Sequence, residues 1–309
     1  MAYRLKPNRS LSSEVRRVGA KQLARAIAEL RAVGTARRDD AVHEARRHVK
    51  KVRALLRLVQ PALGDVYYAA NRRLRAASRL LAPIADGASV VDTFARLDAR
   101  THRLSRHTAV RVRAALVERQ ARVDRKATLD RILGRTAALL RAEEHRVAVC
   151  ELNSHGFHAI GSGLEDSVRR LRRAAKRAAA VPTAGRYHAW RRRAKDLWLQ
   201  LRLLERCCGS AITADVRRLE ALDDCLGEHH NVVLLEEALT REALVSRRET
   251  AMCLHLLRRY QATLRHRATA LAQPLADEKP KQLVRRVKRL WHTQRRAHFA
   301  ARRRWRRAA

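Results

Sequence analysis

A short basic motif occurs twice in the chain, and its two copies lie 145 residues apart. The copies align over 23 residues with eight identities, of which five are cationic or titratable. The identical pairs are His43/His188, Arg46/Arg191, Arg47/Arg192, Lys50/Lys195, Leu56/Leu201, Arg57/Arg202, Leu58/Leu203 and Gly64/Gly209. Guanidinium groups form paired hydrogen bonds with phosphate or carboxylate oxygens, and lysine adds a compact positive charge. The recurring residue types therefore predict the binding of an anion.

The charged residues of the first copy share one side of a predicted helix. At an α-helical turn of 100° per residue, the cations from His43 to Arg57 fall within about a third of the circumference, with Arg53 at the edge. That row is roughly 20 Å long, which is more than one phosphate or one nucleotide needs. Apolar residues flank the row widely, so we expect this helix to be buried on much of its surface. Since unpaired charges inside a core are too costly, we expect the row to face a wet cleft or a bound anion.

The two histidines, His43 and His188, stand at the start of each copy. A histidine close to several cations should resist protonation until a polyanion arrives. We expect both side chains to donate hydrogen bonds to phosphate oxygens at the ends of the rows. The alternative, that each histidine only caps or packs at the start of its helix, stays open at this stage.

The composition also favours a polyanionic partner. The chain has 69 Lys and Arg against 30 Asp and Glu, which gives a formal net charge of +39. Charges of one sign repel one another in a compact protein, and DNA, RNA, an anionic membrane surface or an inorganic polyanion would relieve that repulsion. A nucleotide bias of the genome explains part of the arginine excess, because 59 of these cations are Arg and 10 are Lys. Aromatic residues make up only 4%, which argues against a protein that stacks single-stranded bases.

Cysteine usage and targeting signals bear on the cellular compartment. The five cysteines have no zinc-ligand spacing, and we expect them to be small buried residues in a reducing environment. No signal peptide or apolar span is visible, so the expected location is cytoplasmic. The sequence shows no phosphate-binding loop and no catalytic constellation. We therefore expect no enzyme activity, no cofactor and no metal site, whereas the oligomeric state is left undecided.

The hydrophobic periodicity predicts an all-α protein. Apolar residues recur at spacings of three and four along almost every segment, and no period-two alternation is long enough for a strand. We expect loops at 83–89 and 227–231, one long helix at about 91–118, a connector at 153–163 and a break at 273–280. The offset of 145 persists beyond the motif, because residues 72–74 match residues 217–219. The two halves therefore look like copies of one helical unit.

The paired motif resembles the CHAD domain, the conserved histidine α-helical domain. The resemblance rests on two copies of His-x-x-Arg-Arg-x-x-Lys and on residues 226–235, which are similar to that family's Leu-Gly…Asp-x-x-Val-Leu signature. The second half has Asn231 in place of the signature's Asp, and the first half keeps Asp86 but has Ala85 where an Arg is common. The resemblance implies two four-helix bundles related by a pseudo-twofold axis, at 9–150 and 156–300, with a basic cleft between them. A basic tail follows at 301–309.

The same resemblance implies a function. It implies non-enzymatic binding of inorganic polyphosphate and association with polyphosphate granules. The motif residues that carry over by position are His43, Arg46, Arg47, Lys50, Arg57, His188, Arg191, Arg192, Lys195 and Arg202. Further basic candidates, for which a solvated helix face is the alternative, are Arg16, Arg17, Lys21, Arg169, Arg172, Arg173, Lys176, Arg72, Arg73, Arg217 and Arg218. Two other functions stay open, namely nucleic-acid binding through the same basic surface and an enzyme that acts on polyphosphate.

Overall fold

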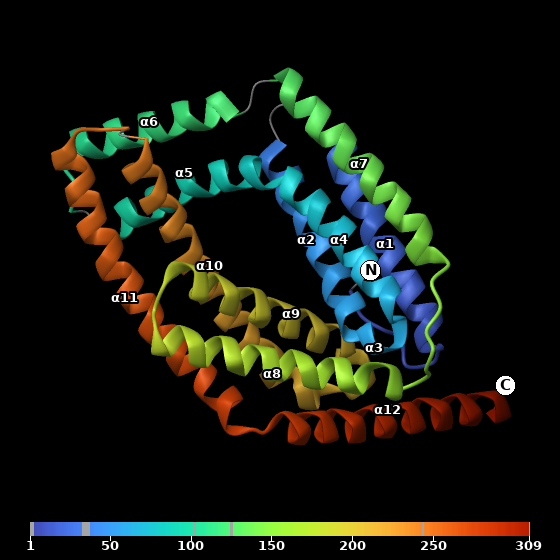
Figure 1. The fold of residues 1–309 in the computed structure, drawn as a ribbon. Coiled ribbons are helices and arrows are strands. Elements are labelled where there is room, and N and C mark those ends of the chain that lie inside the picture. The colour runs from blue at the N-terminus through green and yellow to red at the C-terminus, as the bar shows by residue number, and fades with distance from the viewer. Residues whose placement is uncertain (1–2, 33–37, 102, 124–125, 243, 309) are drawn as a thin grey trace.

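The computed structural model describes residues 3–32, 38–101, 103–123, 126–242 and 244–308. Within these ranges the chain forms twelve α-helices, one short 3₁₀ helix and no strand, which confirms the all-α prediction (Figure 1). The first half contains α1 (Leu11–Arg31), α2 (Arg38–Leu58), α3 (Gln60–Leu63), α4 (Asp65–Leu80), α5 (Ala82–Thr101), α6 (Arg106–Val123) and α7 (Lys126–Ala148). The second half contains α8 (His158–Ala180), α9 (Ala184–Cys208), η2 (Ser210–Ile212), α10 (Thr213–Arg241), α11 (Arg247–Asp277) and α12 (Pro280–Ala308). Among the described residues, no helix is both long enough and apolar enough to span a bilayer.

The helices of each half pack mainly against one another. In the first half, α1 packs along α2 and α7, and α4 packs against α7 and α2. In the second half, α9 packs against α8 and α10, α10 packs on α11, and α12 contacts α8 and α9. Helix α5 leaves the first group and lies against α10 and α6 (Figure 1).

The two motif helices, α2 and α9, are in direct contact. The side-chain amide of Gln200 on α9 donates to the carbonyl oxygen of Ala54 on α2 at 3.3 Å, and both groups are buried. Side chains on several sides of α2, such as Val49, Leu55 and Leu58, are fully buried, as the sequence predicts for this helix. Each such side chain contributes roughly 1.5–3 kcal/mol compared with an exposed one. The position of the motif cations is therefore fixed by a well-packed helix.

The structure requires glycine for two reasons, a positive φ angle at two turns and a close approach between two helices. Gly64 and Gly209, which are identical between the halves, follow α3 and α9 with φ angles of 54° and 73°. Such angles favour glycine, so the turn that closes each motif segment is encoded twice. Gly163 on α8 is needed for close approach instead, because a Cβ there would overlap the carbonyl oxygen of Leu58.

The two expected loops are helical, so both loop predictions are wrong. Residues 83–89 belong to the start of α5, where Pro83 lies in the first turn and its missing N–H leaves no helical hydrogen bond unmade. Residues 227–231 lie inside the continuous helix α10. Gly227 packs there beside Arg191, whose guanidinium would lie 3.5 Å from an added Cβ.

Other helix boundaries also differ from the expected ones. The helix expected at about 91–118 is two helices, because α5 ends at Thr101 and α6 begins at Arg106. Helix α8 begins within the expected connector, at His158, and α11 continues through Pro274 to Asp277. The backbone of the expected basic tail continues α12 as far as Ala308, and the side chains of residues 301–309 lie outside the described part of the structure.

The cysteines behave as core residues. All five are free, four of them are buried, and Cys150 is half-buried. Burial raises the pKa of the Cys207 and Cys208 thiols to about 12, so these groups are neutral at physiological pH.

Candidate anion-binding site

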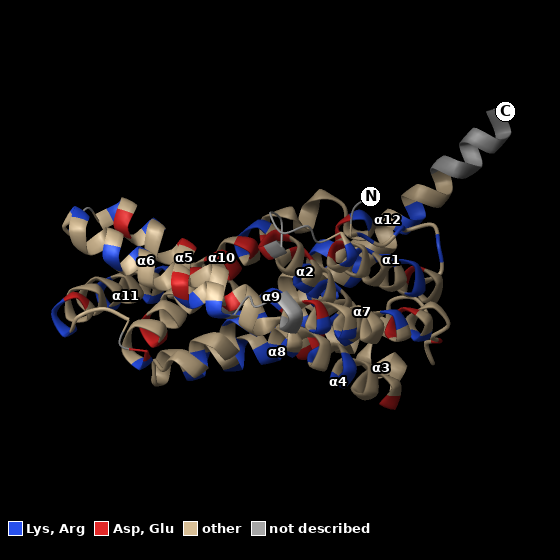
Figure 2. Cartoon of the chain, turned by 90° about the horizontal axis from the view of Figure 1, so that it is seen from above, with Lys and Arg blue, Asp and Glu red and all other residues tan. Residues whose placement is uncertain are grey.

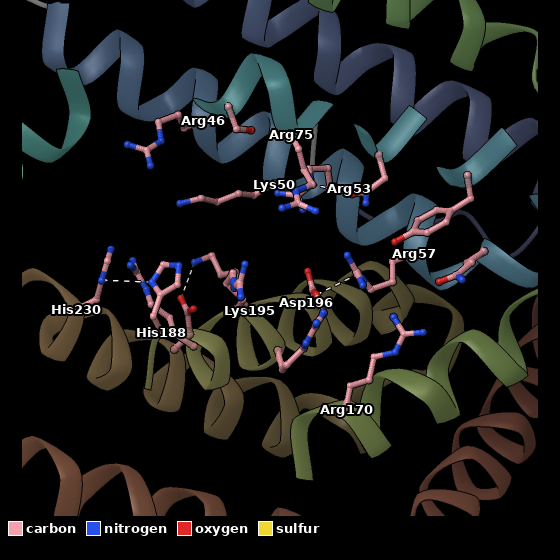
Figure 3. Close-up of a pocket in the computed structure, with 18 of the residues that line it drawn as sticks. Arg46, Lys50, Arg53, Arg57, Arg75, Arg170, His188, Lys195, Asp196 and His230 are labelled. Carbon is pink, nitrogen blue, oxygen red and sulfur yellow. Dashed lines mark hydrogen bonds and ion pairs between the residues drawn. The ribbon is translucent and has the colours of Figure 1, made fainter. Parts of the chain in front are cut away.

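A basic pocket of about 440 Å³ lies where α2 and α4 of the first half face α8 and α9 of the second (Figure 3). Ten of its nineteen lining residues are Lys or Arg, and two are carboxylates. The cations are Arg46, Lys50, Arg53, Arg57 and Arg75 from the first half, and Arg170, Arg191, Arg192, Arg193 and Lys195 from the second. The carboxylates are Asp196 and Asp223. Its volume is typical of a ligand site, and its lining is strongly cationic.

The pocket is elongated along the motif helices. On α2, Arg46, Lys50, Arg53 and Arg57 follow one another at spacings of four, three and four, which places them on one face over roughly 16 Å. Figure 3 shows the histidines at one end of the pocket, and Arg57 and Arg170 near the other. A row of positive charges that faces a second row across a narrow space matches an extended anion with repeated charges.

Five of the cations that line the pocket are held by carboxylates, and one of them, Arg170, pairs with Asp166 of its own helix at 3.6 Å. Arg46 pairs with Asp86 at 3.2 Å, and Lys195 pairs with Asp223 at 2.5 Å. The carboxylate of Asp196 forms ion pairs with Arg57 at 3.1 Å and Arg193 at 3.6 Å, so it joins α2 to α9. These ion pairs position the cations and leave most of the positive charge in the pocket unbalanced.

Lys50 and Arg191 differ from their equivalents in the repeat, because neither forms an ion pair with a carboxylate of the described residues, as is also true of Arg53, Arg75 and Arg192. The internal repeat explains this asymmetry. The position equivalent to Asp223, the partner of Lys195, is Ser78, and it lies in the same pocket as Lys50. In the same way, Asn231 replaces the carboxylate that Asp86 offers to Arg46. Among the four equivalent cations Arg46, Lys50, Arg191 and Lys195, each half therefore has one with a carboxylate partner and one without.

The unpaired cations sit in an unfavourable environment. Burial, together with the positive charges of Arg191, Arg46 and Lys195, lowers the pKa of Lys50 to about 7. Burial also lowers the pKa of Arg191, and the charge of Arg46 acts in the same direction. An anion placed between them would offset this repulsion, because an opposite charge within a few ångströms favours the protonated form.

A pair of histidines lies at one end of the pocket. The Nδ1 atoms of His188 and His230 are 3.3 Å apart, and the ring centroids are 4.4 Å apart. Burial and the nearby arginines lower the pKa of His188 to about 4 and that of His230 to about 3. Both rings are therefore neutral at pH 7, as the sequence predicts for a histidine among cations.

The first-half histidine does not share this arrangement. His43 is exposed and does not line the pocket, although burial and Lys50 lower its pKa as well. The repeat gives the reason, since the position equivalent to His230 is Ala85. The two motif histidines are thus equivalent in sequence and different in environment.

Seven of the candidate residues meet in the pocket, namely Arg46, Lys50, Arg57, His188, Arg191, Arg192 and Lys195. The candidates that do not line it are His43, Arg47, Arg202, Arg16, Arg17, Lys21, Arg169, Arg172, Arg173, Lys176, Arg72, Arg73, Arg217 and Arg218.

Several of these outlying candidates have other partners. Arg17 and Arg73 each bind a buried carboxylate, Glu14 at 2.6 Å and Glu143 at 2.5 Å. Within their own helices, Arg47 pairs with Glu44, Arg169 with Glu165 and Arg218 with Asp215. The guanidinium of Arg202 lies over the ring of Trp198 at 5.3 Å. Arg172, Arg173 and Lys176 border a separate pocket of about 410 Å³ beside Trp190.

Some pocket residues were not among the sequence candidates. Arg53 completes the row on α2, and its Nε donates to the side-chain oxygen of Asn71 at 3.1 Å. The spacing of four, three and four was a usable signal for Arg53. Arg75 and Arg170 reach the pocket from α4 and α8, and only the packing of these helices against the motif helices reveals it.

Comparison with known proteins agrees with this geometry. The family model of the CHAD domain matches residues 17–240, which include both motif helices. The chain belongs to the CHAD domain family. The CHAD domain of the plant Ricinus communis has a similar fold, with a TM-score of 0.60 and 16% identity over 91% of this chain and 96% of that one. PptA from Streptomyces chartreusis matches with the same TM-score and identity over 86% of this chain and 98% of that one. A comparison with curated protein sequences found no match.

The CHAD match and the structural likenesses differ in extent. The matched residues end at Thr240, so α11 and α12 lie beyond the CHAD family model. All of the residues that line the basic pocket fall within the matched range. The pocket therefore belongs to the part of the chain that the CHAD family model matches, and the structural likeness extends further, because the Ricinus communis domain covers 91% of this chain.

Proposed function

We propose that this CHAD domain binds inorganic polyphosphate in the pocket between α2 and α9, without turning it over. The observation that carries the proposal is the pair of cations, Lys50 and Arg191, that face the pocket without a carboxylate partner among the described residues. CHAD domains are known for polyphosphate binding. Polyphosphate is a slender chain with a negative charge on each unit, which matches an elongated pocket with cations along two walls.

The arrangement of the helices supports the fuller form of this proposal. The motif helices pack together, and the identical glycines close the same turn in both halves. We infer that residues 9–150 and 156–300 are two bundles related by a pseudo-twofold axis, and that the basic cleft lies between them. The symmetry would present two equivalent faces to one polymer.

The sharpest test supplies the missing carboxylates. Ser78→Asp would give Lys50 the partner that Lys195 has, and Asn231→Asp would give Arg191 the partner that Arg46 has. We expect each change to lower the affinity for polyphosphate of defined length by about tenfold, because a charged hydrogen bond contributes roughly 1.5–3 kcal/mol. Fluorescence anisotropy at fixed ionic strength would measure this loss.

Two control pairs separate site effects from bulk charge. Arg131→Gln with Arg135→Gln, on the exposed face of α7, should leave the affinity nearly unchanged, whereas Lys50→Gln with Arg191→Gln should abolish tight binding. His188→Ala should weaken binding, and His43→Ala should not, because only His188 lines the pocket. Equal losses from the α7 pair and the pocket pair would contradict the proposal.

Competition and turnover assays address the other functions. Polyphosphate should stay bound in the pocket when duplex DNA is added at matched phosphate concentration, since the pocket volume is that of a small-ligand site. An assay for phosphate release with Mg²⁺ or Mn²⁺ should stay silent. In cells, a fluorescent fusion should gather at polyphosphate granules and become diffuse when Lys50 and Arg191 are replaced. Displacement of polyphosphate by DNA, or release of phosphate, would overturn the proposal.

A further inference from the structure

Helix α12 carries a second cationic surface, away from the pocket. Exposed basic residues recur along it at spacings of three and four, so they share one face. This outer row consists of Lys281, Arg285, Lys288, Arg289, His292 and Arg296. It extends over roughly 22 Å. The helix runs along the outside of the molecule, past α8 in Figure 1, and continues beyond the body in Figure 2.

The outer row has no acidic counterpart. Helix α12 contains no Asp or Glu, and none of the row's Lys or Arg forms an ion pair with a carboxylate of the described residues. Arg286, on another face of the helix, does have acidic partners. Arg286 pairs with Asp215 at 2.9 Å and with Glu278 at 2.8 Å. Acidic partners are thus present where α12 attaches to the body and missing where it faces solvent.

The opposite face of α12 is committed to the protein core. Leu283, Val287 and Trp291 are buried, and the ring of Trp291 meets that of Phe157 at 6.2 Å between centroids. The helix packs against α8 and α9 through this face. The outer row is therefore displayed from a fixed helix and keeps its spacing in solution.

We infer that the outer row of α12 is a second polyanion-binding surface, and that it contacts the phosphate backbone of double-stranded nucleic acid. The row lies on the solvent-exposed side of one helix, which a wide polymer can reach, whereas the basic pocket is lined by residues of several helices. Each duplex strand has a phosphate about every 3.4 Å along the axis, so the row would run past about six of them. The major groove of a duplex also admits an α-helix. This binding would be independent of sequence, because it uses phosphate contacts.

A lipid surface fits the same row less well. Amphipathic helices that bind membranes insert an apolar face between lipids. The apolar face of α12 packs against α8 and α9, so it is not available for insertion. Because α12 has exposed positive charge but no accessible apolar face, a nucleic-acid duplex is a better partner for it than a lipid surface.

The test compares three variants of the full chain for binding of a short fluorescent DNA duplex. Arg285→Glu, Arg289→Glu and Arg296→Glu together reverse the charge of three of the row's six residues, and Arg131→Glu, Arg135→Glu and Arg141→Glu on α7 make the same charge change elsewhere. At each salt concentration between about 50 and 200 mM, the α12 variant should bind the duplex at least tenfold more weakly than the unmodified chain. The slope of log affinity against log salt concentration should be smaller in magnitude by about three. The α7 variant should stay close to the unmodified chain.

The pocket variant, Lys50→Gln with Arg191→Gln, links this test to the first proposal. It should keep its affinity for the duplex while losing polyphosphate, and the α12 variant should show the reverse. A loss of duplex binding in the pocket variant, or an equal loss in the α7 variant, would overturn the inference. The inference would also be overturned if the unmodified chain bound phosphatidylserine-containing vesicles through α12 and did not bind the duplex. Because polyphosphate is measured separately, failure here leaves the pocket proposal standing.

Discussion

Single residues distinguish the two halves of the repeat at the pocket. Asp223 neutralises Lys195, but the equivalent Ser78 leaves Lys50 without such a partner. The reverse holds for the arginines, where Asp86 binds Arg46 and Asn231 replaces the carboxylate near Arg191. A carboxylate at each of these positions would have paired all four of the equivalent cations. Ser78 and Asn231 therefore leave Lys50 and Arg191 without a carboxylate partner in the pocket where we propose that an anion binds.

Polyphosphate binding should take up protons. Lys50, with Arg46, Arg191 and Lys195 beside it and Asp223 nearby, has a pKa of about 7 in the empty pocket, and a bound anion should raise it toward the usual value of about 10.4. The bound state then holds more protons, so the affinity should increase as the pH falls from about 9 to 7. His188 and His230, with pKa values of about 4 and 3, should add to this only in more acidic solution. Calorimetry at pH 8 in buffers with different ionisation enthalpies measures the uptake.

The conservative variant Lys50→Arg provides the control for this prediction. A guanidinium stays protonated throughout this range, so the variant should bind polyphosphate with no proton uptake at pH 8. A binding enthalpy that does not change with the buffer in the unmodified chain would show that Lys50 is already charged in the empty pocket.

At the level of single residues, the sequence predicted the part of the site that the repeat encodes. Arg46, Lys50, Arg191 and Lys195 recur in place, and the structure brings them together. The same reasoning included residues such as Arg73, whose partner Glu143 lies 70 residues away in the sequence and is buried. An arginine that forms an ion pair with a carboxylate far away in the sequence cannot be distinguished, from the sequence alone, from an arginine without such a partner.

At the level of the elements, the helices that periodicity predicts are present, and several of the errors in their boundaries lie at glycine and proline. The sequence pattern predicts a loop at residues 227–231, which begin with Gly227, yet α10 is continuous there. Packing beside Arg191 explains the small residue, and no local rule reports such a contact. Pro83 and Pro274 also lie within helices: Pro83 is in the first turn of α5, where its missing N–H leaves no helical hydrogen bond unmade, and Pro274 is in the last turn of α11.

One helix crossing depends on a missing side chain. Gly163→Ala would force a methyl group onto the Leu58 carbonyl oxygen, so α8 would have to move away from α2. We expect a loss of about 2 kcal/mol in the free energy of unfolding, as for other overpacked sites. Gly134→Ala on α7, where no atom lies within 4 Å of the added Cβ, should be neutral or stabilise the chain by about 0.5–1 kcal/mol. Urea denaturation followed by circular dichroism measures both, and equal effects would contradict the close approach.

The whole molecule has an excess of positive charge that the fold does not neutralise. Figure 2 shows Lys and Arg on helices throughout the structure, in line with the net charge of +39. Repulsion of this kind destabilises the compact state, and salt screens it. A ligand that binds only the folded chain stabilises it by mass action. Stability and polyanion binding are therefore linked through the same charges.

This linkage predicts opposite effects of one variant in the free and bound states. Lys50→Gln with Arg191→Gln removes two cations that repel each other in the empty pocket, so the free protein should unfold at a Tm about 2 °C higher. Polyphosphate should raise the Tm of the unmodified chain by several degrees and that of the variant much less. Differential scanning calorimetry at low ionic strength measures both shifts, with Arg131→Gln and Arg135→Gln as the control of equal charge. If the control gained as much stability and lost as much of the polyphosphate effect, the pocket would be only one part of a uniformly charged surface. The expected result would mean instead that the chain gives up stability at the positions where it holds its ligand.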